Sequence, residues 1–398
     1  MYNEMLSIDL AGSQERNSGY AYFERGKIKC GILKRDEEIL RLADRLNVKI
    51  VGIDAPLSWP KHGKLRQCEL LLKKMKIRFF PVKYGGMKKL TQRGTRLAKT
   101  LQRCGFDVIE LFPGGSYDLL GLKRKDVNGV NAFLSGFDSK AKNVDEADAA
   151  IGLFSLWLYK HGLGLMLKGN DGSILLAKPS VYLGKLINGR FIKRINRFVL
   201  EAKIGGVRRK VYLRNTGKLA DYFYRRNEIY VSEYAGKYRY ILRAVNDPYG
   251  GKVMADPFLD VHIVKGWLRM SGIIARQRKV KFGDFVFDLS WKDGICEVKG
   301  ANMHWKNDKG IAIFPDVYSK RAEKQIKKLS EMKKKTRMIV FVSHFPAKGV
   351  ALNPEFEHLV ELFRCALKKG LSVKALSTII VDNYWIFEKE TPFLWLRQ

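Results

Sequence analysis

Two acidic residues and a lysine near residue 290 have the types and the spacing to hold a metal ion beside a phosphate ester. Asp288, Glu297 and Lys299 fall in the segment 281–300, KFGDFVFDLSWKDGICEVKG. Mg²⁺ and Mn²⁺ take oxygen ligands, and Mg²⁺ keeps several waters, so one or two carboxylates suffice to hold the ion. A neighbouring lysine could orient or activate an attacking water, or stabilise charge that builds on phosphate. Metal-dependent phosphodiester hydrolysis would need these residue types.

A β-hairpin is the element that must bring these residues together. Apolar and polar residues alternate in FGDFVFDL and in GICEVKG, on either side of a Trp-Lys-Asp-Gly turn. A turn at 292–293 would place Asp288 opposite Glu297, and a turn at 293–294 would place it opposite Lys299. Either register puts all three on one sheet face, whereas a three-residue loop would not. The alternative interpretation is an ordinary set of cross-strand ion pairs on a solvated face.

The charge of the chain indicates a polyanionic partner. Its 398 residues include 74 Lys and Arg against 40 Asp and Glu, for a net charge of +34. Residues 1–180 hold 31 basic and 19 acidic residues, and residues 181–398 hold 43 and 21, so both halves contribute. We therefore expect nucleic acid as the partner, with DNA favoured over RNA. Thermophile-type charge enrichment is an alternative, but it usually adds Glu along with Lys.

Composition bounds the class of protein. With 46% hydrophobic residues the chain is expected to be globular, and its length predicts two or three domains. No apolar run approaches about 18 residues, so no membrane span is expected. The N-terminal sequence shows no secretory signal. Five cysteines without a C-x-x-C pair predict reduced thiols in a cytoplasmic protein and no zinc site. The oligomeric state stays open.

Three regions with different patterns divide the chain into 1–178, 185–250 and 251–398. The first predicts an α/β unit, with strands at 5–12, 19–24, 27–33, 49–55 and 106–112 and helices at 36–47, 64–76, 86–104 and 146–161. The second consists of short strand-like pieces between turn signals, typical of a small β-barrel. The third alternates helix, hairpin and strand in the order of a restriction-endonuclease-like core around a mixed sheet. The sequence thus predicts a multidomain α/β and α+β protein.

The barrel region is rich in arginine and tyrosine. Cations interleaved with aromatic rings suit a groove that follows a nucleic-acid strand and stacks its bases. Alternatively, the tyrosines belong to the barrel core and the arginines are merely solvated. The candidate nucleic-acid-binding residues of this region are Arg190, Arg194, Arg197, Arg214, Asn215 and Lys218.

Residues from about 185 to 398 resemble the sugar fermentation stimulation protein A family. The motifs that carry this likeness are GRFIKRINRF (189–198), RNTGK (214–218), KFGDFVFDLS with CEVKG, and AIFPDVYSKRAEKQIKKL (312–329). The resemblance implies an OB-like barrel followed by a PD-(D/E)xK nuclease-like domain, with nucleic-acid binding as the usual activity. Asp288 and Glu297 would then be metal ligands and Lys299 the catalytic lysine. At the head of the next helix, the resemblance adds phosphate contacts from Lys320, Arg321 and Lys324.

One position departs from the pattern of that family. Its helix before the hairpin commonly carries a Glu that can join the metal site. Here PFLDVHIVKGWLRM has Lys265 and Gly266 at that place, and Asp256 and Asp260 occur only upstream. A missing carboxylate would weaken the metal site, which favours binding without cleavage.

The first 178 residues resemble a different family, domain-of-unknown-function family 429, which is a set of predicted nucleases with an RNase H-like fold. The motifs are SIDLAGS (7–13), GIDAPLSWP (52–60), VIELFP (108–113) and DEADAAIG (145–152), with RxCE (66–69) and a basic helix at 83–101 between them. Carboxylates from strand ends and one helix would form a two-metal phosphodiester site of this fold.

The carboxylates of this second candidate site can also be derived from the strands. Asp9 and Asp54 each end an apolar strand, Glu110 ends a later one, and Asp148 shares a helix face with Asp145. Asp9, Asp54 and Asp148 are the expected metal ligands, with Glu110 as a further catalytic residue. The alternative interpretation makes the sequence after Asp54 a turn and Asp145 a helix cap.

The sequence therefore predicts a nucleic-acid-binding protein that hydrolyses phosphodiester bonds with Mg²⁺ or Mn²⁺. A non-catalytic DNA-binding regulator that retains nuclease-like scaffolds is the first alternative. A protein that handles nucleotides or sugar phosphates is the second, but the chain shows no phosphate-cradling loop.

Overall fold

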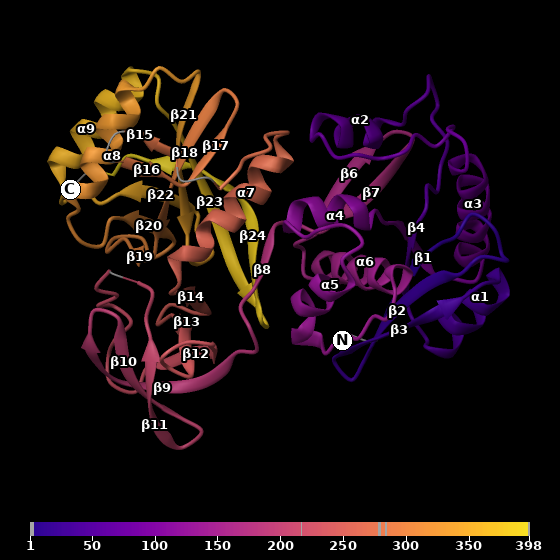
Figure 1. Cartoon of the computed structure of the whole chain (residues 1–398), viewed down its shortest axis with the longest axis horizontal. Coiled ribbons are helices and arrows are strands. Elements are labelled where there is room, and N and C mark those ends of the chain that lie inside the picture. Colours follow the sequence, from indigo (N-terminus) through magenta and orange to yellow (C-terminus); the bar gives the residue numbers. More distant parts are fainter. Residues whose placement is uncertain (1–3, 216, 278–279, 283–284, 397–398) are drawn as a thin grey trace. The chain divides into compact units, whose positions relative to one another are not determined.

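The computed structural model describes residues 4–215, 217–277, 280–282 and 285–396. The chain forms two compact units, one of residues 1–179 with 266–273 and the other of residues 180–265 with 274–398. Figure 1 shows the elements of each unit. Among the described residues, no helix combines the length and the apolar character that crossing a membrane would require.

A five-stranded sheet in the order β3-β2-β1-β4-β5 forms the centre of the first unit. Strands β1, β4 and β5 are parallel to one another. Strand β2 runs antiparallel to β1, and β3 runs antiparallel to β2. The central strands β1 and β4 are buried along almost their whole length, as expected for strands covered on both faces. Their bounds are β1 (Met5–Asp9), β2 (Ser18–Glu24), β3 (Lys27–Leu33), β4 (Ile50–Asp54) and β5 (Asp107–Glu110).

Helices cover both faces of this sheet because its side chains alternate between two cores. Leu6 and Ile8 of β1 pack in one core with residues of α1 (Asp36–Arg45) and α3 (Met87–Arg103). Ser7 points the other way, toward α6 (Val144–Lys160), and a Cβ on Gly152 of α6 would lie 2.3 Å from its Oγ. Glycine at 152 therefore allows α6 to lie directly on β1, and α6 also packs against β2.

Smaller elements complete the first unit. The hairpin β6–β7 joins the sheet through a parallel bridge between Leu111 and Leu175. Helices α4 and α5, which the sequence pattern does not predict, follow β5. The bounds are α2 (Gln67–Lys74), α4 (Pro113–Leu120), α5 (Val127–Phe133), the 3₁₀ helix η1 (Ser135–Phe137), β6 (Leu165–Gly169) and β7 (Gly172–Leu176).

The second unit begins with a closed OB-like β-barrel. Five strands follow one another around it, because β11 pairs with β10 on one side and with β13 on the other. Bulges in β9, opposite β10, and in β13, opposite β12, interrupt the ladder and help the strands to curve. The strands are β9 (Ile187–Asn196), β10 (Val199–Ile204), β11 (Val207–Tyr212), β12 (Glu228–Glu233) and β13 (Tyr240–Asn246), with β14 (Lys252–Met254) added to β13.

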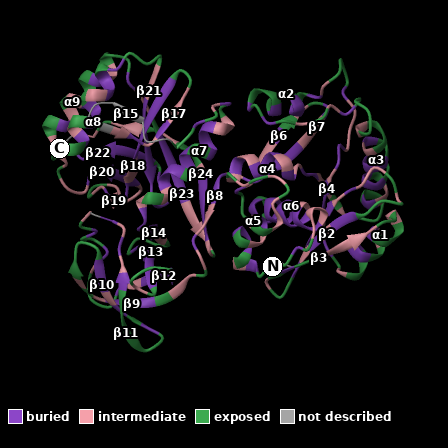
Figure 2. Ribbon diagram, in the orientation of Figure 1, coloured by how far each residue is buried: buried purple, intermediate pink, exposed green. Residues whose placement is uncertain are grey.

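A mixed six-stranded sheet forms the rest of the second unit, in the order β17-β18-β21-β23-β24-β8. Strands β18, β21 and β23 are parallel and largely buried (Figure 2), because other elements cover both faces of the sheet. The strands are β8 (Ser180–Tyr182), β17 (Leu289–Trp291), β18 (Gly294–Ala301), β21 (Thr336–Ser343), β23 (Ser372–Val381) and β24 (Tyr384–Thr391).

Further elements surround this sheet. Helices α8 and α9 pack on each other, and α8 packs on β21. A smaller sheet has the order β19-β20-β22-β25. The bounds are η2 (Pro257–Leu259), α7 (Asp260–Met270), α8 (Lys320–Glu331), α9 (Glu357–Lys368), β19 (Met303–His304), β20 (Ile311–Phe314), β22 (Gly349–Leu352) and β25 (Phe393–Leu394).

The hairpin expected at 281–300 differs from the single long pair that its alternation suggests. A bend at Asp288 divides it into two short antiparallel pairs, β15 (Val280–Phe282) with β16 (Phe285–Phe287) and β17 with β18. Trp291 pairs with Gly294, so the turn is at 292–293. Residues 283–284, within the expected first strand, lie outside the described residues.

Two candidate carboxylate sites

The first candidate site is at the carboxyl ends of two neighbouring parallel strands of the first unit. Asp9 is the last residue of β1, Asp54 is the last residue of β4, and the two are direct partners in the ladder. Paired residues on adjacent strands point to the same face. Asp9 shares its face with Ser7, so both carboxylates lie on the side of the sheet that α6 covers.

The first turns of α6 lie over this end of the sheet. Asn143 caps the helix by accepting a hydrogen bond from the Glu146 backbone N–H at 2.9 Å. Gly19 is the ladder partner of Asp9, and a Cβ on Gly19 would lie 2.0 Å from the carbonyl oxygen of Asp145. Only glycine therefore allows α6 to approach here. Asp148 lies one turn further, where its Oδ1 accepts a hydrogen bond from the Tyr117 hydroxyl at 2.7 Å.

These three carboxylates repel one another. Burial raises the pKa of Asp9 well above its ordinary value, and the negative charge of Asp148 raises it further. Burial followed by the charges of Asp9 and Asp148 does the same to the pKa of Asp54. Neither Asp9 nor Asp54 has a hydrogen-bond or ion-pair partner among the residues that the structure describes. The charge of Arg124 lowers the pKa of Asp54 and Asp148, but Arg124 forms its ion pair with Asp118, so protons or an added cation would balance the remaining charge.

Glu110, the fourth acidic residue predicted for this site, has partners of its own. It is the ladder partner of Ile53, so it starts from the opposite sheet face to Asp54. Arg66 donates to both of its oxygens, at 2.7 Å to Oε2 and 2.6 Å to Oε1, and the Leu57 backbone N–H donates to Oε2 at 2.8 Å. This buried, bidentate ion pair leaves Glu110 much less able than Asp9 or Asp54 to bind a cation.

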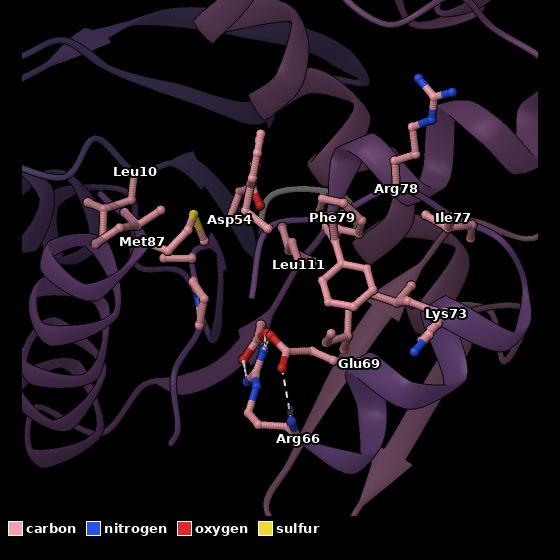
Figure 3. A pocket seen from close by; sticks show the side chains of 18 of the residues that line it. Leu10, Asp54, Arg66, Glu69, Lys73, Ile77, Arg78, Phe79, Met87 and Leu111 are labelled. Atoms are coloured by element: carbon pink, nitrogen blue, oxygen red, sulfur yellow. Dashed lines mark hydrogen bonds and ion pairs between the residues drawn. The ribbon is translucent and has the colours of Figure 1, made fainter. Parts of the chain in front are cut away.

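A cavity of about 800 Å³ opens beside these carboxylates. Figure 3 shows the ring of Phe79 between Asp54 and the Arg66–Glu69 pair, with Lys73 and Arg78 at the margin. The wall is otherwise mostly apolar, with Leu72, Ile77, Phe80, Met87, Leu90, Leu111, Phe112 and Ile174. The cavity therefore combines an acidic end, an apolar wall and cations.

The second candidate site is in the second unit, at the bend before β17. The register of β17 and β18 continues to Asp288 opposite Glu297, one of the two arrangements expected from the sequence. The Val298 backbone N–H donates to Asp288 Oδ2 at 2.8 Å, so the bend directs this carboxylate toward β18. Lys299 Nζ donates to Glu297 Oε1 at 2.7 Å. The structure thus brings Asp288, Glu297 and Lys299 together.

A glutamine of α8 links two members of this site. Gln325 Nε2 donates to Glu297 Oε1 at 2.6 Å, and Gln325 Oε1 accepts from Lys299 Nζ at 2.7 Å. Burial raises the pKa of Glu297, Lys299 lowers it, and Asp288 raises it again. Burial also raises the pKa of Asp288, against the Val298 N–H. Glu297 Oε2 is buried without a hydrogen-bond partner among the described residues, so one oxygen remains for a ligand.

A further acid, Asp260, lies near this site. It is on the helix before the hairpin, in which the family commonly carries a Glu. Asp260 begins α7, and its carboxylate oxygens are 3.0 and 3.1 Å from His344 Nε2. Burial raises the pKa of Asp260, and the charge of Asp288 contributes in the same direction. Asp260 thus lies within electrostatic reach of Asp288, but His344 already contacts both of its oxygens.

Three of the expected nucleic-acid-binding residues instead build the loop after β11. Arg194 donates to backbone oxygens of residues 196, 197, 215, 217 and 218. Arg214 pairs with buried Asp256. Asn215 is 5% exposed, its Oδ1 accepts from the Gly217 N–H at 2.9 Å, and its Nδ2 has no partner among the described residues. Arg194 and Arg214 thus direct donors to the protein's own backbone and carboxylate, and Asn215 is buried in the same loop.

The remaining expected cations are on the surface. The loop itself is tied to the segment before α8, because Asp316 Oδ2 accepts from the Lys218 backbone N–H at 3.0 Å. The exposed residues of the set are Arg190, Arg197, Lys218, Lys320, Arg321 and Lys324. Of these, Arg321 acts on the second site, where its charge lowers the pKa of both Asp288 and Glu297.

Both sites suit a hard divalent cation that brings some of its own ligands. Among the described residues, no three His, Cys, Asp or Glu side chains converge as a ready-made metal site. Each site nevertheless offers carboxylate oxygen without a partner, from Asp9 and Asp54 in one and from Glu297 in the other. Mg²⁺ is typically held by one or two carboxylates together with water and phosphate oxygens, so these residues fit it.

Several residues of these sites escaped the sequence patterns. Gln325 follows Arg321 by one helical turn, a spacing that could have placed it on the face of α8 that meets the hairpin. The Asp260–His344 contact joins residues 84 positions apart, and no local pattern signals it. The bidentate pair between Arg66 and Glu110 spans 44 positions and is equally hidden.

Comparisons with known proteins match the second unit. Residues 192–254 match the domain family described as the SfsA N-terminal OB domain, and residues 259–383 match the sugar fermentation stimulation protein RE domain. A sugar fermentation stimulation protein homolog of Archaeoglobus fulgidus is 33% identical over 197 residues, which cover 47% of this chain and 85% of that protein.

Solved structures show weaker likeness. A structure of Pyrococcus furiosus SfsA in complex with Ca²⁺ is 24% identical, with a TM-score of 0.49, and covers 54% of this chain and all of that one. T. thermophilus RuvC in complex with a Holliday junction substrate is 15% identical, with a TM-score of 0.26, and covers 40% of this chain and 97% of that one. From the domain matches and the identity to the A. fulgidus homolog, the chain belongs to the sugar fermentation stimulation protein family.

Proposed function

We propose that this chain binds nucleic acid and hydrolyses its phosphodiester bonds with Mg²⁺ or Mn²⁺. The observation that carries this proposal is the pair Asp9 and Asp54, side by side at two strand ends, at the edge of a cavity and without a partner among the described residues. Uncompensated carboxylates at such a place are costly unless a cation binds there. The net charge of +34 supports nucleic acid as the substrate, DNA before RNA.

In this proposal the first unit is an RNase H-like domain. Asp9 and Asp54 would hold the metal ion, and Asp148 on α6 adds a third negative charge that acts on both. A bound divalent ion would stabilise charge on the phosphate and lower the pKa of a bound water. Tyr117 fixes the orientation of Asp148 through its hydroxyl. Arg66 neutralises Glu110, which leaves Glu110 the role of supporting the loop at Leu57.

The second unit is, in the same proposal, a PD-(D/E)xK nuclease-like domain. Asp288 and the free Oε2 of Glu297 would hold a metal ion. The Lys299 ammonium has three hydrogens, of which Glu297 and Gln325 accept two, so the third can face water or phosphate. The exposed Lys320, Arg321 and Lys324 on α8 would contact the phosphate backbone.

A second candidate function, DNA binding without cleavage, has its own support in the second unit. Lys299 and Gln325 already satisfy Glu297 Oε1, and His344 already contacts Asp260. A site that balances most of its charge internally has less need of a metal ion. In that case the second unit would act as a nucleic-acid-binding regulator domain.

Cleavage assays with the full chain test the proposal. Single-stranded and duplex DNA and RNA are incubated with Mg²⁺ or Mn²⁺, for the wild type, Asp54→Asn, Lys299→Met and the double variant. We expect Asp54→Asn to lower the cleavage rate by at least about 100-fold at the first site, as a lost ligand costs more than a lost supporting group. Lys299→Met should remove any cleavage that remains.

Matched variants separate the chemistry from general effects on charge. Asp107 is exposed at the start of β5, at the other end of this strand from Glu110. Lys374 is exposed on β23 of the six-stranded sheet of the second unit. Asp107→Asn and Lys374→Met should leave cleavage unchanged. Metal-dependent cleavage that persists in the Asp54→Asn, Lys299→Met double variant would contradict both site assignments, and its absence from the wild type would leave the binding function.

A further inference from the structure

The cavity beside Asp9 and Asp54 is larger and more apolar than metal binding requires. A metal ion needs oxygen ligands and room for water, whereas most of this cavity of about 800 Å³ is lined by Phe, Leu, Ile and Met side chains. Cavities of this size and composition hold organic ligands. Part of the apolar wall comes from α2 and the residues after it, and the rest comes from α3, from the residues after β5 and from β7.

Two consecutive phenylalanines give this wall its character. Phe79 is partly buried against the core that contains Cys68 and Leu72, so its ring is anchored at the centre of the cavity (Figure 3). Phe80 is 68% exposed. Its ring is stacked with that of Tyr84, which is 66% exposed, with centroids 6.4 Å apart and planes within 8° of parallel. Exposed flat rings of this kind form a platform on which a nucleobase can stack.

Cations are placed on the same segment as these rings. Lys73, Lys76 and Arg78 line the cavity and are exposed. In Figure 3, Lys73 and Arg78 lie at the margin, on the far side of Phe79 from Asp54. The arrangement offers an aromatic wall for a base, exposed cations for its phosphates and carboxylates for a metal ion at the bond to be cut.

We propose that this cavity receives an unpaired nucleobase, so that the first unit acts on nucleic acid with bases out of the helical stack, in a single strand, a loop or a bulge. This inference rests on the proposed nucleic-acid function of the same site. A base inside a continuous duplex cannot enter a side cavity without unstacking, which costs a few kcal/mol. A substrate that is already unpaired avoids that cost, and the protein therefore prefers it to a paired duplex.

Oligonucleotides with one fluorescent base test this inference with the full chain. A DNA duplex that carries a single bulged 2-aminopurine is compared with the same duplex in which 2-aminopurine is paired, in EDTA so that no cleavage occurs. We expect tighter binding of the bulged duplex, and quenching of its 2-aminopurine fluorescence as the base stacks on Phe80. Phe80→Ala should weaken binding of the bulged duplex by about 5- to 100-fold and leave the paired duplex unchanged.

Two further variants control for loss of structure or of apolar surface. Phe80→Trp keeps an aromatic ring and should keep the preference for the bulge. Tyr159 is a 42% exposed aromatic residue of α6 that does not line the cavity, so Tyr159→Ala should have no effect. Equal binding of both duplexes by the wild type overturns the inference. An equal loss of affinity for the bulged duplex in Phe80→Ala and Tyr159→Ala also overturns it. The same holds if adenosine monophosphate binds in the cavity but the bulged duplex does not bind.

Cleavage assays with Mg²⁺ distinguish failure of this inference from failure of the proposed function. If the wild type shows no preference for the bulge but cleaves DNA in a manner that depends on Asp54, the base cavity is refuted and hydrolysis stands. If the preference depends on Phe80 but no metal supports cleavage, the base cavity stands as a binding site and hydrolysis is refuted.

Discussion

The two carboxylate sites differ in how the protein balances their charge. In the first unit, Asp9 and Asp54 are adjacent and have no hydrogen-bond or ion-pair partner among the described residues. In the second unit, Glu297 accepts hydrogen bonds from both Lys299 and Gln325, and Asp288 accepts one from a backbone N–H. The same kind of chemical group is thus left uncompensated in one site and largely compensated in the other.

This difference indicates how strongly each site depends on a bound cation. Buried carboxylates that repel one another destabilise the metal-free protein, and a divalent cation removes that penalty. A carboxylate that already has an ammonium partner gains less from the cation, because the cation must compete with the lysine. We therefore expect metal binding to stabilise the first unit more than the second.

The largest effect is expected from Glu110, the acid predicted for the first site that is paired with an arginine. Arg66→Met leaves buried Glu110 unpaired and should lower the free energy of unfolding of that unit by about 3–5 kcal/mol. The double variant Arg66→Met, Glu110→Met should recover most of this loss, since removal of both charges replaces the pair by apolar contacts. Chemical denaturation, monitored by hydrogen exchange of the β5 amides, measures the free energy of unfolding of the single and the double variant. An Arg66→Met protein as stable as wild type would show that the pair contributes nothing.

A smaller loss is expected from the amide that organises the second site. Gln325→Leu removes hydrogen bonds to Glu297 and Lys299 and should weaken metal binding there by about 10- to 100-fold. Calorimetric titration of Mn²⁺, with Asp54→Asn as the background so that the first site is silent, isolates this site. Lys327→Leu, an exposed position on the same helix, is the matched control. Equal affinities in all three proteins would remove Gln325 from the site.

A neutral amide in place of the carboxylate should stabilise the first site more than the second. In EDTA, Asp54→Asn relieves repulsion and desolvation and should raise the free energy of unfolding of the first unit by about 1–2 kcal/mol. Glu297→Gln also relieves the cost of burial, but it replaces the ion pair with Lys299 by a bond to a neutral acceptor, so the free energy of unfolding of the second unit should rise by less than that of the first. Hydrogen exchange of β4 and β18 gives the two values separately. A gain in the second unit as large as that in the first would mean that the charge balance of the sites does not differ as described.

Sequence patterns predicted the strands and the individual acids, but not the strand register and the contacts that bring these acids together. The apolar runs within 5–12 and 49–55 predict two strands, whose apolar parts end at Asp9 and Asp54. That these strands are parallel neighbours with the two acids in direct register depends on the sheet order β3-β2-β1-β4-β5, which no local pattern encodes. The turn at 292–293 was one of two registers that the hairpin sequence allows, because both bury the same apolar residues.

Arginine composition was a weaker guide than strand pattern. Arg194 and Arg197 look alike in the sequence, yet Arg194 donates to five backbone oxygens while Arg197 is exposed. A guanidinium can hold a loop together or contact phosphate with the same donors, and the tertiary surroundings decide which. Gln325 and the contact of Asp260 with His344 were missed because the partners are far apart in the chain.

The smallest contrast is expected in the dependence of stability on pH, because the sign is the same for both units. In each, burial raises the pKa of the carboxylates, so the folded protein holds their protons more tightly than the unfolded chain. As pH rises from the ordinary Asp value of 3.8 through the raised pKa, the unfolded chain loses its protons first. The free energy of unfolding should therefore fall over this range, by at most about 1.4 kcal/mol per pH unit for each group.

The slope should be steeper for the first unit, where repulsion among Asp9, Asp54 and Asp148 adds to burial, than for the second, where Lys299 opposes it. Hydrogen exchange of β1 and β18 in EDTA between pH 4 and pH 8, corrected for the intrinsic exchange rate, measures each slope. Saturating Mg²⁺ should flatten the slope of the first unit, since the cation favours the ionised form. A first-unit slope that Mg²⁺ leaves unchanged would mean that Asp9 and Asp54 do not bind the ion.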